Sequence, residues 1–432
     1  MVNLCKLMPA VPVALEAALN VLHASLPRLD AELLERLASW LAFHVSNFGF
    51  SLAPFAKPWG DAIAAARRER EEDASAVKPA AVTSTLPALP EAPDPHVRFI
   101  GITLEHMTRL SYLKRVAADL PAPFAPFLPA EFKGLLDWDA PAAGDMEPSS
   151  AAALSATLLA KLRAKIPNEH VVAWLDAELP ARGGGGAQRI PIVVQTLLHA
   201  GAKSVSHLEK LLDKFSWLLC HVAPSHAERV ELLSAGGRYW RASPQMATLL
   251  LSKLRKHRVV DGSAVLGYAF AHDGRGGLGT SGWEAVSELV ESTVLEQRDA
   301  SQALRRVERR LEHLSSEGMD DAAVGHAQAD VDQARTALDD ARRSKKSILA
   351  SLFTSACSLL SAHEASSAAS GAPLHHEWRR VVLGRTLALG RLYATEFSLQ
   401  TVEIVVEGND VAENVRDLVF PPLRQVQTWV GG

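Results

Sequence analysis

Cysteine is scarce in this 432-residue chain, which carries only Cys5, Cys220 and Cys357. Three widely separated cysteines form no metal-ligand pair, and their odd number indicates a reducing compartment. A basic excess is lacking too, because 45 lysines and arginines face 49 aspartates and glutamates, for a net charge of −4. This balance argues against a free-standing nucleic-acid-binding protein.

Long apolar runs are also missing. No window reaches the roughly 18 uninterrupted apolar residues of a membrane-spanning helix. The chain begins with an apolar stretch, but Glu16 interrupts it, and its amphipathic spacing predicts a packed helix rather than a signal peptide. We therefore expect an intracellular protein without a membrane segment.

Alternating strand patterns are almost absent, and helical periodicity takes their place. The clearest example is residues 239–270. Ser243 occupies an expected N-cap and Pro244 the first helical position, and Asp261 caps a second helix after a short connection. A connection of that length makes the two helices antiparallel. The stripe along the first helix consists of Met246, Leu249, Leu250, Leu254 and His257.

The same periodicity predicts helices along most of the remaining chain. A helix from Asp30 to Phe48 is expected to bury one face, made of Leu33, Leu37, Leu41, Val45 and Phe48. Further helices are expected at about 98–118, 151–165, 168–178, 191–198, 205–222, 376–405 and 411–430. Short helices in pairs indicate a solenoid of helical hairpins.

Residues 284–362 follow a heptad pattern. The repeating apolar positions are Leu304, Val307, Leu311 and Leu314, then Val324, Val331, Leu338 and Leu352, with Gly318 between the two sets. Charged residues flank them, which predicts an antiparallel coiled-coil hairpin at about 290–355. The predicted fold class is therefore all-α: a HEAT-like solenoid of helical hairpins with an antiparallel coiled-coil hairpin.

Two segments interrupt the helical pattern. Residues 67–95 begin with the charged run RREREED and continue as an Ala/Pro-rich tract, which we expect to be a disordered loop. The charged run alone is also typical of a solvated helix end. The segment 137–150, DWDAPAAGDMEPSS, is the expected linker. The sequence thus predicts one domain at 1–136 and a second, with the coiled coil, at 151–432.

Motifs of catalysis and metal binding are absent from the sequence. Glycine-rich tracts at 183–186 and 274–280 join predicted helices, and no Lys-Ser/Thr pair follows either, so flexible loops are favoured over phosphate-binding loops. The sixteen histidines include no HExxH arrangement, and no GxSxG elbow is present. We predict no catalytic residue, no cofactor and no metal site.

A candidate binding site lies on the helix VRFIGITLEHMTRLSYLKRV. The expected buried stripe consists of Ile100, Leu104, Met107 and Leu110. Glu105, Arg109 and Tyr112, spaced i, i+4 and i+7, are expected together on the opposite side. Tyrosine and arginine are over-represented in protein interfaces, which favours a protein-binding triplet. The alternative is an ion pair with a tyrosine that covers a neighbouring repeat.

A second candidate is the basic cluster that ends the first helix of 239–270. It consists of Lys253, Arg255, Lys256 and Arg258. Cations at a helix C-terminus complement the helix dipole, so we favour this structural interpretation over contact with RNA.

Seven segments, in order along the chain, carry a resemblance to a known family. They are VNLCKLMP, WLAFHVSNFGF, HMTRLSYLKRV, NEHVVAWL, VVQTLLHAGAKSVSHLEKLLDKF, SPQMATLLLSKLRKHRVVDGSAVLGYAF and SGWE. Together they resemble the large subunit of the nuclear cap-binding complex, a family of three helical-repeat domains like the middle domain of eukaryotic initiation factor four-gamma. The match begins within the second domain, so 1–136 is expected to be a partial second domain and 151–432 the third.

The resemblance also implies departures from the family pattern. The family's first domain, with its basic nuclear-import segment, has no match, and we expect a fragment or a short form. The family has a tryptophan-rich stretch after HVSNFGF, where this chain keeps only Trp59.

The resemblance implies a non-enzymatic scaffold. In the family, a small subunit with an RNA-recognition fold binds the 7-methylguanosine cap, and the large subunit orders it and recruits mRNA processing, export and decay factors. Glu105 and Tyr112 match the family positions that help hold the small subunit. The implied location is the nucleus, with shuttling to the cytoplasm. The alternative is a helical-repeat adaptor in translation or mRNA decay without a cap-binding partner.

Overall fold

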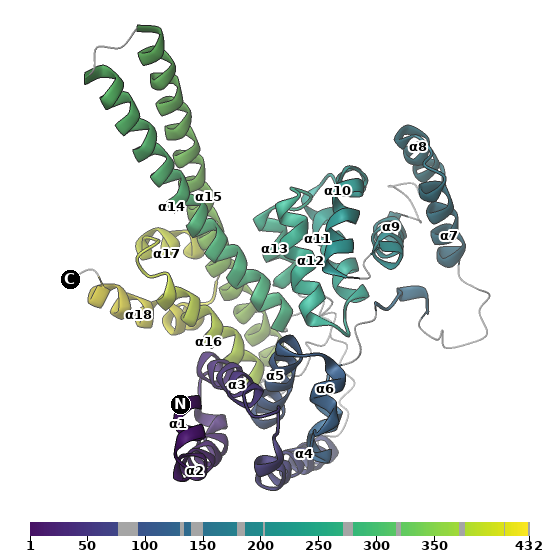
Figure 1. Cartoon of the computed structure of the whole chain (residues 1–432), viewed down its shortest axis with the longest axis vertical. Helices are drawn as coiled ribbons and strands as arrows, with labels where there is room; N and C mark the ends of the chain where they lie inside the picture. The colour runs from purple at the N-terminus through teal and green to yellow at the C-terminus, as the bar shows by residue number, and fades with distance from the viewer. Residues whose placement is uncertain are drawn as a thin grey trace.

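The computed structural model of the chain is an assembly of packed α-helices from which a two-helix arm projects (Figure 1). It describes residues 1–76, 94–129, 134–139, 150–178, 186–201, 204–270, 280–316, 321–370, 376–409 and 411–430. Within these ranges every regular element is an α-helix or a short 3₁₀ turn. The predicted all-α class is confirmed.

The N-terminal unit has its own apolar core, built from residues between Leu19 and Phe124. Its elements are α1 (Val2–Leu7), α2 (Ala10–Ala24), η1 (Leu26–Arg28), α3 (Ala31–Ser46), η2 (Ala53–Phe55), α4 (Ala56–Ala76), α5 (Pro95–Leu110), α6 (Leu113–Ala118) and η3 (Ala122–Phe127). Helices α3 and α5 form its central pair, and α4 and η3 pack on α5.

Helix α3 begins where the sequence predicts, because the Asp30 carboxylate accepts a hydrogen bond from the Leu33 backbone N–H at 2.9 Å. Its buried face differs from the prediction. Leu41 and Val45 are buried, but the Leu33 side chain is half exposed and Phe48 is 37% exposed. Side chains spaced by four drift about 40° per step around a helix, so Leu33 and Val45 cannot share one buried face. The residues of α3 that belong to the N-terminal core are Leu34, Ala38, Leu41, Ala42 and Val45.

The charged run RREREED is helical and not part of a loop, because α4 continues to Ala76. Arginine and glutamate are good helix formers, so the helix extends beyond its buried part. This corrects the start of the predicted loop at residue 67 and agrees with the alternative that the run is a helix end. The Ala/Pro-rich tract at 77–93 lies outside the described residues.

A histidine stands in the middle of the N-terminal core. The His23 ring stacks on the Trp59 ring at 4.5 Å between centroids and contacts the His96 ring at 4.6 Å. It is only 3% exposed. Burial, and second the charge of His96, lowers the pKa of His23 from 6.5 to about 3. His23 is therefore neutral in the folded protein at neutral pH.

We predict that His23 makes stability fall with acidification. Below pH 6.5 the unfolded chain binds a proton at this position that the folded protein does not bind until pH 3 is approached. Stability is therefore lost as the pH falls below 6.5, by about 2 kcal/mol at pH 5. Urea unfolding at pH 7 and pH 5 measures this loss. The loss should shrink in His23→Phe but persist in His170→Gln, a change at an exposed position; an equal loss in both variants would contradict the assignment.

The C-terminal unit is a stack of hairpins with a second apolar core, which begins at Leu136. Its elements are η4 (Asp137–Asp139), α7 (Ser150–Arg163), α8 (Asn168–Glu178), α9 (Gly186–Gly201), α10 (Val205–Val222), α11 (His226–Tyr239), α12 (Pro244–Lys256), α13 (Gly262–Ala269), α14 (Thr280–Ser316), α15 (Asp321–Ser370), α16 (His376–Leu392), α17 (Leu399–Glu407) and α18 (Glu413–Val430). Helices α9, α11 and α13 form one layer, and α10, α12 and the start of α14 form the other. This two-layer stacking is that of a helical-repeat solenoid.

The hairpin predicted at 239–270 is present as α12 and α13. Pro244 is the first residue of α12, and the Asp261 carboxylate caps α13 by accepting from the Ala264 N–H at 2.8 Å. The Ser243 side chain makes no capping bond. Arg258, in the connection, adopts a left-handed backbone with φ +57. Met246, Leu250 and Leu254 of the predicted stripe are buried.

The two long helices predicted from the heptads are α14 and α15, which run side by side and form the projecting arm (Figure 1). Polar pairs tie the two helices together along the arm: Arg335 binds Glu308 at 3.3 Å, and Lys345 donates to Gln297 at 2.9 Å. The seam of α15 is buried at Ala327, Val331 and Leu338. The coiled-coil packing itself stays a prediction, and Gly318 lies outside the described residues.

The second half of α15 is a core helix of the C-terminal unit. It packs against α13, α16, α17 and α18, and Leu352, Phe353 and Cys357 are fully buried. Burial raises the pKa of the Cys357 thiol to about 12. The stretch Ala322–Ala365 is long and apolar enough to cross a membrane. However, half of its most apolar part is buried inside the protein, as in the core helix of a protein without a membrane span.

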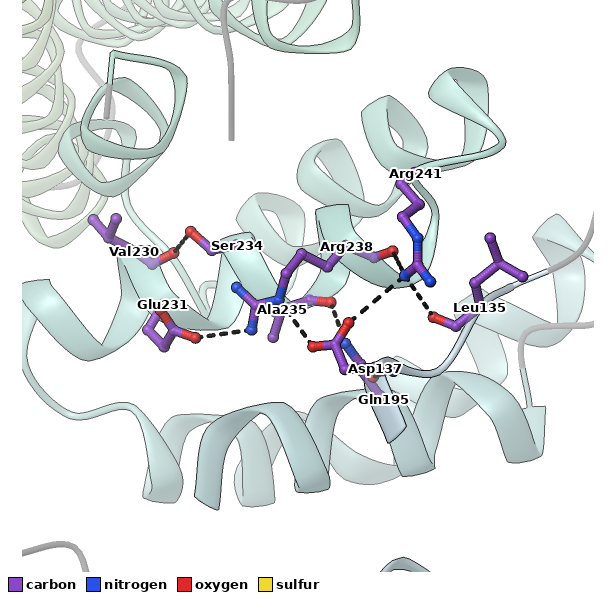
Figure 2. Close-up of polar contacts among 9 residues, drawn as sticks. All are labelled: Leu135, Asp137, Gln195, Val230, Glu231, Ser234, Ala235, Arg238 and Arg241. Atoms are coloured by element: carbon purple, nitrogen blue, oxygen red, sulfur yellow. Dashed lines mark hydrogen bonds and ion pairs between the residues drawn. The ribbon is translucent and has the colours of Figure 1, made fainter. Parts of the chain in front are cut away.

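The segment that enters the C-terminal unit is anchored and is not a free linker (Figure 2). The Asp137 carboxylate accepts from Arg238 Nε at 2.9 Å, and the Asp137 backbone N–H donates to Gln195 Oε1 at 2.9 Å. Leu136 is buried in the same core. The predicted linker at 137–150 therefore begins too early, because its first residues bind α9 and α11. Residues 140–149 lie outside the described residues.

Candidate partner-binding site

The candidate site lies where α3 and α5 pack against each other in the N-terminal unit. Asp94 caps α5 by accepting from the His96 N–H at 2.8 Å, and Pro95 is its first residue. The inner side of α5 is buried as predicted at Ile100, Leu104 and Met107. The outer sides of the two helices enclose an open groove of about 500 Å³, lined by Arg36, Ser39, Trp40, Phe43, His106, Arg109 and Leu110.

The groove presents apolar and aromatic surface to solvent. Phe43 is 57% exposed and Leu110 is 50% exposed, so Leu110 does not belong to the buried stripe that the sequence predicts. Tyr112, two residues beyond Leu110, is 70% exposed. Arg36 and Arg109 add cationic groups to the lining. Exposed aromatic residues beside arginine are typical of protein-binding surfaces.

Tyr112 does not extend the helical face of Glu105 and Arg109, contrary to the prediction from spacing. Helix α5 ends at Leu110, Ser111 is extended with φ −152 and ψ 174, and Tyr112 is the N-cap of α6. Turning the chain here lets Val116 of α6 enter the N-terminal core, where it is 1% exposed. Burial of this apolar side chain outweighs continuation of the helix.

Glu105 and Arg109 lie in an ion-pair cluster that joins the two units. Arg109 pairs with Glu105 one turn earlier, and its Nη1 and Nη2 donate to the Glu284 carboxylate of α14 at 2.6 and 3.0 Å. Glu284 also accepts from the Thr248 hydroxyl of α12 at 3.0 Å. The side chains of this cluster are only 13–22% exposed. Arg109 thus reaches the groove and the C-terminal unit at once.

The pKa values in this cluster are set by burial and by the contacts of the Glu105 and Glu284 carboxylates with the single Arg109 guanidinium. Burial raises the pKa of Glu105, and the opposing charge of Arg109 only partly offsets it. Burial works against the charged form of Arg109 as well, but its pKa is raised because bonds to Glu284 and Glu105 outweigh burial. Burial, and second the charge of Arg109, lowers the pKa of His106. His106 is therefore a neutral member of the groove lining at neutral pH.

A second, partly buried ion pair joins the two units and was not predicted from the sequence. Arg385 of α16 binds Glu35 of α3, with side chains 14% and 18% exposed. Burial lowers the pKa of Arg385 to about 10. Gly384 of α16 lies beside Ala31 of α3, where an added Cβ would make an ordinary contact with the Cβ of Ala31 at 3.4 Å. The sequence gives one indication of this ion pair, which is that Arg385 interrupts an apolar run. An arginine on the apolar face of a helix needs an acidic partner.

The basic cluster of α12 is largely neutralised by acids of the same unit. Lys253 and Lys256 both bind Glu209 of α10, at 3.0 and 3.2 Å, and Arg255 faces Glu296 of α14 at 3.3 Å. This pairing favours the structural interpretation over RNA contact. The glycine-rich tracts at 183–185 and 274–279 lie outside the described residues, and each leads into a helix. In the described part of the chain, no three His, Cys, Asp or Glu side chains are grouped to hold a metal ion.

These features define an all-α helical-repeat protein with an exposed apolar groove and charged contacts between its units. A model of the family described as MIF4G like matches residues 146–397, more than half of the chain, and another of that description matches residues 1–63. The chain belongs to the MIF4G-like family.

Curated relatives point to one kind of family member. The chain is 27% identical over 282 residues to nuclear cap-binding protein subunit 1 of Homo sapiens. The aligned region covers 63% of this chain and 32% of the human protein. It is 28% identical over 286 residues to the Gallus gallus protein of the same name, with 63% and 32% covered. The chain thus spans about a third of the length of these relatives. The resemblance drawn from the seven segments is confirmed.

Proposed function

We propose that the chain is a non-enzymatic scaffold of a cap-binding complex, in which the α3–α5 groove holds a small subunit with an RNA-recognition fold. The observation that carries the proposal is the likeness to nuclear cap-binding protein subunit 1, and the exposed groove of about 500 Å³ between α3 and α5 supports it. Capped RNA is bound through the small subunit. The proposal includes a nuclear location with shuttling to the cytoplasm, and recruitment of mRNA processing, export and decay factors.

The groove supplies what a protein partner needs. Phe43, Leu110 and Tyr112 offer apolar area that loses water on binding, which is the main favourable term in most protein–protein association. Trp40 and Arg109 line the groove together with Phe43 and Leu110, whereas Tyr112 is not part of the lining and follows two residues after Leu110. Direct contact is proposed for Tyr112, whereas Glu105 and Arg109 act by holding the groove against the C-terminal unit.

The scaffold works by selecting one state of its partner. A flexible small subunit that contacts the groove only in its ordered conformation is shifted toward that conformation by the free energy of those contacts. The groove walls are held in place from two sides, because α3 and α5 share the N-terminal core and two partly buried ion pairs join them to the C-terminal unit. A rigid surface loses little conformational freedom on binding.

Tyr112→Ala is expected to weaken binding of the organism's own small cap-binding subunit by about 30-fold, or about 2 kcal/mol, as for an interface hot spot. Phe43→Ala should act in the same direction. Co-expression followed by titration of the purified chains measures the affinity. Trp429→Ala is the matched control, because Trp429 is 72% exposed on α18, away from the groove.

Two outcomes would contradict the proposal. If the small subunit neither co-purifies with the chain nor gains affinity for a cap analogue, the scaffold role is wrong, and an adaptor without a cap-binding partner is favoured. If the two chains associate but Tyr112→Ala and Trp429→Ala bind alike, the partner lies on another surface.

A further inference from the structure

The distal half of α14 carries an exposed stripe of arginines, which the proposed function does not use. Arg305, Arg306 and Arg309 are all exposed. At about 100° per residue they fall within an arc of about 100°, on the side of α14 opposite Leu304 and Leu311 of the seam with α15. We call these three residues the arginine stripe. Helix α14 is one of the two helices of the arm that projects from the body of the protein (Figure 1), and the stripe lies in its distal half.

The arginine stripe has no carboxylate partner among the described residues. Arg306 Nε donates to the Gln302 carbonyl at 3.3 Å and Arg309 Nε to the Arg305 carbonyl at 3.1 Å, both along their own helix. Other arginines of the arm are neutralised: Arg310 faces Asp330 at 3.9 Å, and Arg335 binds Glu308. The basic cluster of α12 is paired as well. In the described part of the chain, the three guanidinium groups of the stripe therefore form no ion pair, which leaves them available to an external anion.

The surroundings of the stripe decide what kind of anion fits. In the described part of the chain, no large apolar side chain is exposed between Leu295 and Leu392. A docked protein needs an apolar centre to its interface, and a helix that lies in a membrane surface needs an apolar face. Neither is offered here. A flexible polyanion that binds through charge alone is the occupant that the surface fits.

We propose that the arginine stripe binds the phosphate backbone of single-stranded RNA, without reading its sequence. Guanidinium groups bind phosphate through paired N–H donors. Arg305 and Arg309 stand about 6 Å apart along the helix axis, and a flexible single strand can bring successive phosphates to both. Glu312 lies one turn beyond Arg309 and marks the end of the stripe toward the tip of the arm.

The test is fluorescence anisotropy of a labelled, uncapped single-stranded RNA with the full chain, across a series of salt concentrations. The variant Arg305→Gln, Arg306→Gln, Arg309→Gln is expected to lose about tenfold or more in affinity at low salt. Its salt dependence, the slope of log K against log salt, should become shallower by about 2, since three phosphate contacts each contribute about 0.7 for a single strand.

The matched control removes the same number of positive charges from the other helix of the arm, by Arg342→Gln, Arg343→Gln and Lys346→Gln. Arg342 and Arg343 pair with Asp339 and Asp340 on that same helix, and Lys346 is exposed. It should bind RNA within about twofold of the parent chain. Circular dichroism confirms that both variants keep their helices. Equal binding by the stripe variant and the parent would overturn the proposal, as would an equal loss in both variants. The test uses neither cap nor partner, so its failure leaves the scaffold role standing.

Discussion

Arg109→Met is expected to lower the free energy of unfolding by about 3 kcal/mol. The methionine fills much of the same space, but it leaves Glu105 and Glu284 facing each other, mostly buried, without a counter-charge. Removing one partner of a buried ion pair is costly because the remaining charge has lost its water and gained nothing in return. Urea unfolding followed by circular dichroism measures the change.

Arg36→Met is the control for this prediction. Arg36 lines the same groove and pairs with Glu32 at i, i+4, but its side chain is 68% exposed. An exposed pair of this type contributes about 0.5 kcal/mol or less. Adding Glu284→Gln to Arg109→Met should restore part of the loss, because it removes one of the two unpaired carboxylates. If Arg109→Met and Arg36→Met unfold at the same urea concentration, the ion-pair cluster does not hold the units together.

Trp59→Ala is expected to cost about 3–5 kcal/mol, the usual range when a large aromatic side chain is deleted from a core. Trp59 is 1% exposed and stacks on Phe55 at 4.1 Å and on His23 at 4.5 Å. Its indole N–H donates to Asn20 at 2.9 Å. The variant loses apolar burial, both stacking contacts and this bond, and leaves a cavity between α2 and α4.

Two companion variants separate these contributions. Trp59→Phe keeps the stacking and loses mainly the indole hydrogen bond, so a smaller loss of about 1–2 kcal/mol is expected. Trp429→Ala deletes an exposed tryptophan of α18 and should change stability by less than about 0.5 kcal/mol. Equal losses in Trp59→Ala and Trp429→Ala would show that the N-terminal core does not depend on Trp59.

Helix positions were predictable because their signals are local. Asp30 and Asp261 cap the helices that the sequence assigns to them, and the connection after α12 produces the expected hairpin. Each signal lies within a few residues of the structure it specifies. The extent of α4 was not predicted, because the charged run RREREED has no apolar residues to show a helical period. Its arginines and glutamates are nevertheless good helix formers, and the helix continues through them.

The candidate site was only partly predictable. Spacing placed Glu105 and Arg109 one turn apart, and the structure brings them together. The same spacing placed Tyr112 on their face, which is wrong because α5 ends at Leu110. The groove could not be predicted, because it forms only where α3 and α5 pack together. In addition, Leu33 and Leu110 were predicted to be buried, whereas each is half exposed. A periodic pattern identifies the apolar face of a helix. Which residues at the margins of that face are buried depends on the helices that pack against it.

By itself, the sequence determined an all-α chain, the order of its hairpins, most helix starts and the family resemblance, since these depend on short-range spacing and capping. Only the tertiary structure decided that Arg109 meets Glu284, 175 residues later, and that Arg385 meets Glu35. It also decided that Lys253, Arg255 and Lys256 of the α12 basic cluster have acidic partners, whereas the arginine stripe has none among the described residues. Charge pairing over such separations depends on how the two units pack, and no local pattern in the chain encodes that distance.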